Sequence, residues 1–199
     1  MSPDFFKVVR NQRACRSFAP DDVDEPTIVE VLEAATFAPS AENRQPWVFV
    51  VVREPRRKSE IGEITRKAWE GGGRAHSEGR LSARLLEDVD CGAMGGISAA
   101  PVVVVVGGDS SLVDERVLQA SVFPAVQNLL LAAQALGLGS ALTTLPLVFG
   151  DRLSEIVGLP AHVRPIAVVP IGWPRRNLGP PRREPIARKA HRESFGARW

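Results

Sequence analysis

The sequence has few of the residues that build metal centres, disulfide frameworks or hydrolytic active sites. Its 199 residues include two cysteines, Cys15 and Cys91, and three histidines that are scattered along the chain. Neither set has the spacing of a metal site, and two cysteines form no recognisable disulfide framework. No Ser-His-Asp or Cys-His arrangement can be argued from the spacing either. These absences favour a protein of the reducing cytoplasm that holds no metal.

Long apolar runs and strong charge are also missing. No segment approaches the length of a membrane span, and the amino terminus lacks the pattern of a signal peptide. A net charge of +2 gives no indication of nucleic-acid or membrane binding. No strand-like run is followed by G-x-G-x-x-G, and the glycines 71–73 lack the Lys-Ser/Thr ending of a phosphate loop. A Rossmann-type dehydrogenase is therefore disfavoured.

The apolar residues that are present indicate an α+β protein with one core. The five consecutive valines 102–106 form the clearest buried strand, and the run 47–52 indicates a strand covered on both faces. The segment 118–136 is apolar on nearly all sides, which marks a central helix in a monomer core or at a dimer interface. The predicted mixed sheet has strands at 47–52, 101–107, 140–144 and 166–171. Helices are expected from Ser2 and at 27–37, 61–70, 118–136 and 151–157, with a charged turn at 53–58.

Two polar stretches stand out as candidate binding sites. Ser40, Asn43 and Gln45 lie on one short connection between a helix and a strand, where they could bind the polar edge of a flat heterocycle or simply form a polar turn. Arg13 and Arg16 lie on one short segment and could grip a phosphate or remain solvated. Cys15 lies between these arginines, which would lower its pKa, so a nucleophilic role is an alternative.

These stretches resemble the nitroreductase family. The run A-P-S-x-x-N-x-Q-P-W at 38–47 is similar to the flavin-binding loop of that family, and Arg13, Arg16 and Phe18 match its R-R-S-x-R-x-F motif. Gln12 and Ala14 depart from that motif at positions where arginine and serine are common. Further similarity covers the apolar helix with its glycine stop and the G-L-P … G-W-P pattern near 158–174. Residues 10–52 and 118–186 match well, and 53–100 hardly match.

The resemblance implies a nitroreductase-like three-layer fold, an intertwined homodimer and bound FMN. The chain would form a single domain over 1–199, with a variable, mobile lid at 71–96 and a basic extension at 175–199 that packs on the partner subunit. Because the flavin would supply the chemistry, no catalytic residue is expected. The residues that the resemblance assigns to cofactor binding are Arg13, Ala14, Arg16, Pro39, Ser40, Asn43, Gln45, Thr143, Thr144, Leu145, Arg182 and Arg183.

The activity implied is ping-pong two-electron transfer through the flavin. NADH or NADPH would give hydride to the flavin and leave, after which a nitroaromatic, a quinone or a similar flat acceptor would be reduced. Three alternatives stay open. One is a relative with other flavin chemistry, such as the synthase of the vitamin B12 lower ligand or a dehalogenase. The others are an enzyme that uses a deazaflavin and a non-catalytic flavin-binding protein.

Overall fold

A four-stranded sheet forms the centre of the structure, a computed structural model that describes residues 4–198. Its strands are β1 (Trp47–Val52), β2 (Val102–Asp109), β3 (Gly139–Ser140) and β4 (Val163–Gly172). They lie in the order β1-β2-β4-β3, and each neighbouring pair is antiparallel. A parallel pairing occurs at the isolated bridge between Ala14 and Ser140, beside β3. The predicted α+β class is confirmed, but the four strands are not the mixed sheet that was expected, since all their pairs are antiparallel and, in residues 4–198, only this bridge is parallel.

Strand β2 is buried on both faces, as its valines predict. Val102 to Val106 are all fully buried. Since side chains alternate along a strand, Val102, Val104 and Val106 belong to one apolar cluster, and Val103 and Val105 belong to a second. Strand β1 has the predicted bounds, but its first five residues are only half-buried because it lies at the sheet edge. The expectation that β1 would be fully covered is therefore wrong.

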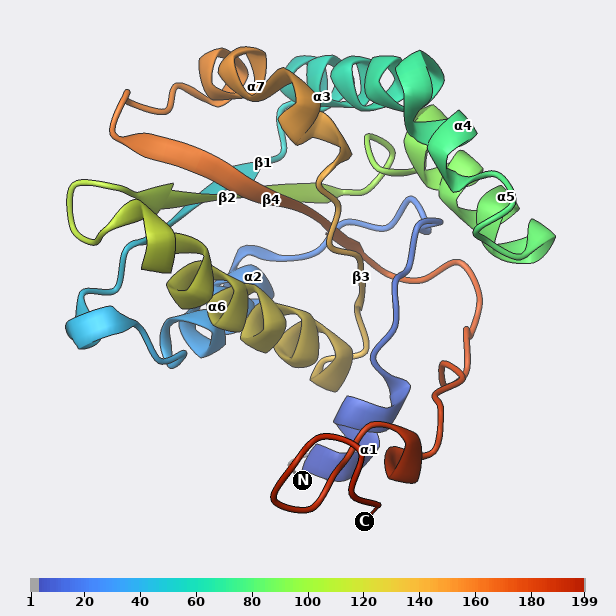
Figure 1. The fold of residues 1–199 in the computed structure, drawn as a ribbon. Helices are drawn as coiled ribbons and strands as arrows, with labels where there is room; N and C mark the ends of the chain where they lie inside the picture. Colours follow the sequence, from blue (N-terminus) through green and yellow to red (C-terminus); the bar gives the residue numbers. More distant parts are fainter. Residues whose placement is uncertain (1–3, 199) are drawn as a thin grey trace.

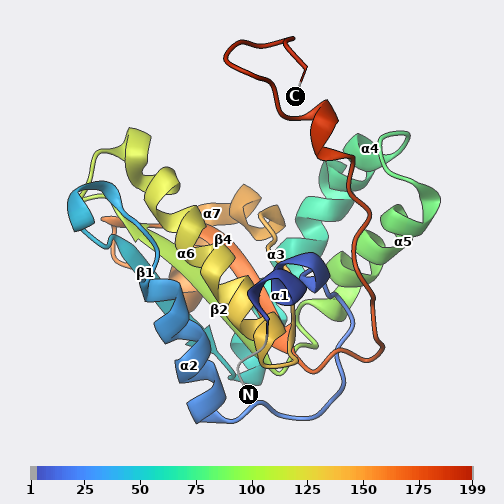
Figure 2. The ribbon, with the colours of Figure 1, turned by 90° about the horizontal axis from the view of Figure 1, so that it is seen from below.

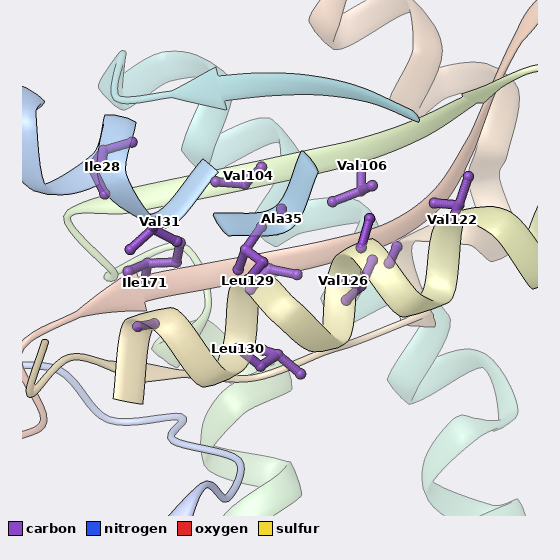
Figure 3. Packing of buried hydrophobic residues seen from close by; sticks show 14 of the residues in the cluster. Ile28, Val31, Ala35, Val104, Val106, Val122, Val126, Leu129, Leu130 and Ile171 are labelled. Carbon is purple, nitrogen blue, oxygen red and sulfur yellow. The ribbon is translucent and has the colours of Figure 1, made fainter. Parts of the chain in front are cut away.

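Each face of the sheet is covered by its own pair of helices (Figure 1). Helices α2 (Glu25–Thr36) and α6 (Glu115–Ala135) pack on one face, and α3 (Pro55–Ala68) and α7 (Gly150–Val157) pack on the other. Figure 3 shows how Val31 and Leu129 from the first pair meet Val104 and Ile171 of the sheet. The three expected layers, helices, sheet and helices, are thus present.

Helix α3 begins earlier than the sequence pattern indicated. The predicted turn at 53–58 is wrong, because α3 starts at Pro55 and runs through that stretch. The Glu54 carboxylate accepts hydrogen bonds from the backbone N–H groups of Arg56 and Arg57, and proline fits the first turn of a helix. At the amino terminus, residues 1–3 lie outside the described part, and Asp4 caps helix α1 (Phe5–Asn11).

The predicted strand at 140–144 is shorter than expected. Strand β3 comprises only Gly139 and Ser140, and the sequence that follows leaves the sheet before Thr143 forms a single bridge to Val168. A 3-10 turn, η4 (Leu145–Phe149), then leads into α7. The glycine stop of α6 is present, since Gly137 follows the helix with a φ of +82°.

The predicted lid region is helical and projects beyond the sheet (Figures 1 and 2). Helices α4 (Arg74–Ser77) and α5 (Ala83–Cys91) lie between two π-helical segments, η2 (Trp69–Gly73) and η3 (Gly92–Gly96). Each π segment contains a glycine with positive φ, +146° at Gly72 and +141° at Gly95. Only glycine adopts such angles without strain, which explains why both ends of the region are glycine-rich. In residues 4–198, no helix is long and apolar enough to cross a membrane.

The two-face packing predicts a difference between two valines of α2. Val31 is fully buried, whereas Val29 is 44% exposed. Replacing Val31 by alanine should lower the free energy of unfolding by about 2 kcal/mol through lost burial and a new cavity. The same change at Val29 should lower it by less than about 0.5 kcal/mol. Urea denaturation of both variants tests this, and equal losses would show that α2 packs on a different face.

Candidate functional site

The segment that contains Arg13 and Arg16 extends the sheet beyond its last strand. The Cys15 N–H donates to the Ser140 carbonyl at 2.9 Å, and the Ala19 N–H donates to the Trp173 carbonyl at 2.8 Å. Cys15 and Phe18 are buried at 2% and 4% exposure, so they anchor the segment in the second apolar cluster. These backbone and side-chain anchors fix the positions from which the two arginines extend.

Arg13 lines a cavity of about 810 Å³ between α1, the end of α6 and the beginning of the tail. Its Nη1 donates to the Leu178 carbonyl at 2.9 Å, so the segment and the tail meet here. One wall contains Gly137 and Gly139, which have no side chains. A Cβ added at Gly139 would lie 2.6 Å from the Cys15 sulfur, which excludes any side chain at that position. Asp4, Lys7 and Asn11 at the amino-terminal end belong to the polar lining, as do Gln134 and Asn177.

Arg16 lines a second cavity, of about 260 Å³, together with Thr143, Thr144 and Leu145. The structure thus brings together four of the residues that the resemblance assigned to flavin binding. The guanidinium is not alone, because its Nη1 lies 2.8 Å from a carboxylate oxygen of Asp88 in α5. Most of the remaining lining is apolar and comes from the lid region and its flanks, including the buried indole of Trp69. The Trp69 Nε1–H donates to Asp90 at 2.6 Å.

The residues around these cavities suit FMN. Guanidinium groups bind phosphate through paired charge-assisted hydrogen bonds, and Arg13 and Lys7 place two cations in the larger cavity, against one carboxylate, that of Asp4. Its volume lies in the range of about 300–1,000 Å³ that is usual for cofactor and ligand sites. Ala14 offers no side-chain donor, but its backbone pairs with Ser140 close to both cavities. The chemistry of the donors therefore agrees with a phosphate-bearing flat cofactor.

The loop after α2 has a strained backbone that is held at both ends. Glu42, Asn43 and Gln45 have positive φ angles of 52°, 55° and 50°, which cost roughly 1–3 kcal/mol each in non-glycine residues. The Ser40 hydroxyl accepts from the Gln45 N–H at 3.0 Å, and the buried Ser121 hydroxyl of α6 accepts from the Ala41 N–H at 3.1 Å. Asn43 and Gln45 are exposed, as is Pro39.

This loop does not lie beside the arginines within one chain (Figure 1). It precedes β1 at the end of the sheet where the Asp109 N–H donates to the Pro46 carbonyl at 2.7 Å. The Arg13–Arg16 segment pairs with β3. The residue of β4 that pairs with β3 pairs on its other side with Val102, which lies at the other end of β2. The eight residues of β2 span roughly 24 Å in between, at about 3.4 Å per residue.

Arg182 and Arg183 lie in the tail that follows β4. Both are exposed, and neither lines the cavity of Arg13 or that of Arg16. The Arg183 Nη1 donates to the Arg182 carbonyl at 3.0 Å. Their expected contact with a cofactor phosphate stays a prediction.

Sequence reasoning missed two residues at the smaller cavity, one in its lining and one that pairs with a lining residue. Trp69, which lines the smaller cavity, stands two residues before the triple glycine, and Asp88, which pairs with the lining residue Arg16, stands four residues before Gly92. These are the local signals that could have marked them.

Cys15 is not an activated thiol. Burial raises the pKa of its thiol and outweighs a backbone hydrogen bond from Ser17 and the charge of Arg16, which lower it. The expectation that flanking arginines would lower the pKa of Cys15 overall is therefore wrong. The residue packs with Phe18 and against Gly139 as a small apolar side chain.

Known proteins are similar to this chain in sequence, and solved structures are similar to it in fold. A protein from Methanothermobacter thermautotrophicus described as a putative NADH dehydrogenase/NAD(P)H nitroreductase is 32% identical over 185 residues, covering 88% of this chain and 80% of that protein. Mouse iodotyrosine deiodinase 1 is 30% identical over 191 residues, or 90% of this chain. The aligned part is 65% of the deiodinase, so the chain spans about two thirds of that protein.

A solved structure with a similar fold is a complex with FMN. It is a putative nitroreductase from Desulfovibrio desulfuricans in complex with FMN, 25% identical, with a TM-score of 0.77 and coverage of 98% of this chain and 99% of that one. The sequence model of the nitroreductase family matches residues 9–173. This range includes the arginine segment, the strained loop and all four strands. The chain therefore belongs to the nitroreductase family.

Proposed function

We propose that the protein is an FMN-dependent NAD(P)H oxidoreductase. The observation that most favours this is the placement of Arg13 and Arg16 on one anchored segment, each lining one of two cavities. FMN would supply the redox chemistry, accepting hydride from NADH or NADPH and passing two electrons to a second substrate in a ping-pong cycle.

The protein's own residues would bind and orient that cofactor. Arg13 would hold the phosphate in the larger cavity, and Arg16 would place a positive charge beside the ring in the smaller one. Thr143 and Thr144 would bring hydroxyl and backbone groups to the same place. Exclusion of water would come from the apolar lining that Leu145 and Trp69 provide.

A complete site would require two copies of the chain. The loop with Ser40, Asn43 and Gln45 lies roughly 24 Å along the sheet from the arginine segment, by the length of β2. A two-fold homodimer would place the loop of one subunit against the arginines of its partner. Phe5 and Phe6 of α1 are 64% and 63% exposed, and apolar surface of this kind favours a covered face. The tail from 175 onward, with Arg182 and Arg183, would cross to the partner as well.

The second substrate would be a flat, largely apolar acceptor such as a nitroaromatic or a quinone. The smaller cavity has Arg16 as its charged lining residue, and that cation is already paired with Asp88. The lid at 71–96 would cover the bound acceptor.

Two free cysteines, one buried and one exposed, fit a reducing cytoplasm. Reductive dehalogenation is the second candidate reaction, favoured by the 30% identity to iodotyrosine deiodinase over 90% of the chain.

The first prediction from this proposed function is spectroscopic. The purified protein should bind FMN, show the yellow flavin absorption, and be bleached by NADH or NADPH under nitrogen. A quinone or a nitroaromatic should restore the colour, whereas an iodinated tyrosine should not. Re-oxidation by the iodotyrosine alone would favour the dehalogenase. A protein that takes up no FMN even on reconstitution would contradict both.

The second prediction concerns the shared site. Arg13→Ala should abolish FMN binding in a homodimer, and so should the double change Asn43→Ala with Gln45→Ala. Co-expressed with different affinity tags, the two variants should form mixed dimers that bind one FMN, because one of the two sites then has both halves intact. Mixed dimers of two differently tagged Arg13→Ala chains serve as the control and should bind none. No recovery in the first mixture would place all the binding residues of a site in one subunit.

A further inference from the structure

Three residues at four-residue intervals enclose Arg16. Asp88 in α5 pairs with its guanidinium at 2.8 Å. A Cβ on Gly92 would lie 2.6 Å from the Arg16 Cδ, and a Cβ on Gly96 would lie 2.2 Å from the Arg16 carbonyl oxygen. The absence of side chains at both glycines therefore lets the arginine stem and backbone lie directly on the segment that begins with Asp88.

This contact joins the lid region to the floor of the smaller cavity. Asp88 belongs to α5, which projects beyond the sheet, whereas Arg16 belongs to the anchored segment beside Ser140 (Figure 1). The two side chains are only 20% and 23% exposed, so solvent screens their attraction less than at an open surface. Arg176 from the beginning of the tail also approaches Asp88, at 4.0 Å.

The ion pair leaves room for a ligand on the same guanidinium. The bond to Asp88 uses Nη1, and a guanidinium has five N–H donors in a planar fork. A carboxylate that binds one end of the guanidinium fixes its plane. The other N–H donors can then bind a ligand with little further loss of side-chain conformational entropy.

We propose that Asp88 is a positioning residue of the flavin site, which orients Arg16 and thereby couples cofactor binding to the lid segment, defined here as residues 74–91 within the lid region 71–96. The proposal rests on the proposed function, since Arg16 must face FMN. Asp90 lies on the same helix but has other partners. It accepts hydrogen bonds from Trp69, which precedes the lid, and from Arg74 within the lid. Glu87 is the neighbouring exposed carboxylate and gives the matched control for a loss of one negative charge.

The test is a titration of the apo-protein with FMN, in which binding is measured by the quenching of flavin fluorescence. Asp88→Asn should raise the dissociation constant of FMN about fivefold, as expected for loss of a charge-assisted bond that orders the arginine facing the cofactor. Glu87→Gln should stay within twofold of the wild type. In an Arg16→Met background, Asp88→Asn should add less than twofold, because the residue it orients is gone. Unchanged or tighter binding in the Asp88→Asn single variant would overturn the proposal, and tighter binding would mean that Asp88 competes with the cofactor.

A second readout follows the lid itself. Trypsin can cleave the lid segment at Arg74, Arg80 and Arg84, and saturating FMN should slow this cleavage in the wild type and in Glu87→Gln. In Asp88→Asn at saturating FMN, protection should be lost. Equal protection in that variant would refute the coupling. Wild-type protein that binds no FMN would instead refute the proposed function.

Glycine variants keep the proposal testable if Asp88→Asn folds poorly. Gly92→Ala should displace the Arg16 side chain and weaken FMN binding. Gly71→Ala lies in the other π segment, where an added Cβ would have open space, and should leave FMN affinity within twofold of the wild type. Equal affinities of the two variants would show that the contact of Arg16 with this segment has no part in binding.

Discussion

Burial of β2 on both faces is the constraint on which the rest of the structure depends. Its alternate valines belong to two separate apolar clusters, so one strand stabilises both helical layers. Full burial of a valine contributes roughly 1.5–3 kcal/mol, and five in succession make this strand the least replaceable element of the fold. β1 and β4 take their register from it, and the positions of the loop before β1 and of the segment beside β3 follow from that register.

The same strand also sets the distance between the two groups of candidate cofactor residues. The strained loop lies at the Asp109 end of β2, and the arginine segment lies near the Val102 end. Neither group can approach the other without breaking the sheet. A site that used both groups would therefore need a second chain, as in the homodimer proposed above. The exposed phenylalanines of α1 are consistent with a second chain that covers this helix.

Features that depend on local pattern could be predicted from the sequence. The valine run gave β2, the apolar run after Pro46 gave the bounds of β1, and the family motifs marked the loop and the arginines. The beginning of α3 was missed because the capping role of Glu54 was not recognised beside a proline in a charged stretch. The half-burial of β1 depends on its place at the sheet edge, which no single segment of sequence reveals.

Contacts between distant segments were the least predictable part of the site. The pairing of Arg16 with Asp88 spans 72 positions, and it joins a stretch that matches the family to one that hardly does. Arg13 meets the Leu178 carbonyl 165 positions away through a backbone acceptor, which has no signature in residue type. Such contacts arise only when the anchored segment, the lid and the tail are brought together by the sheet.

Strain in the loop after α2 is consistent with a functional constraint. Three non-glycine residues with positive φ within four positions are unusual, and asparagine is the only one of the three that tolerates this region well. The strain persists because two hydroxyl groups accept hydrogen bonds from the loop backbone. Ser40 belongs to the loop itself, and Ser121 belongs to α6. Those bonds leave the side chains of Asn43 and Gln45 exposed on a rigid backbone. A loop that only connected α2 to β1 would gain nothing from this arrangement, whereas a loop that presents two amides to a ligand gains a fixed geometry before the ligand arrives.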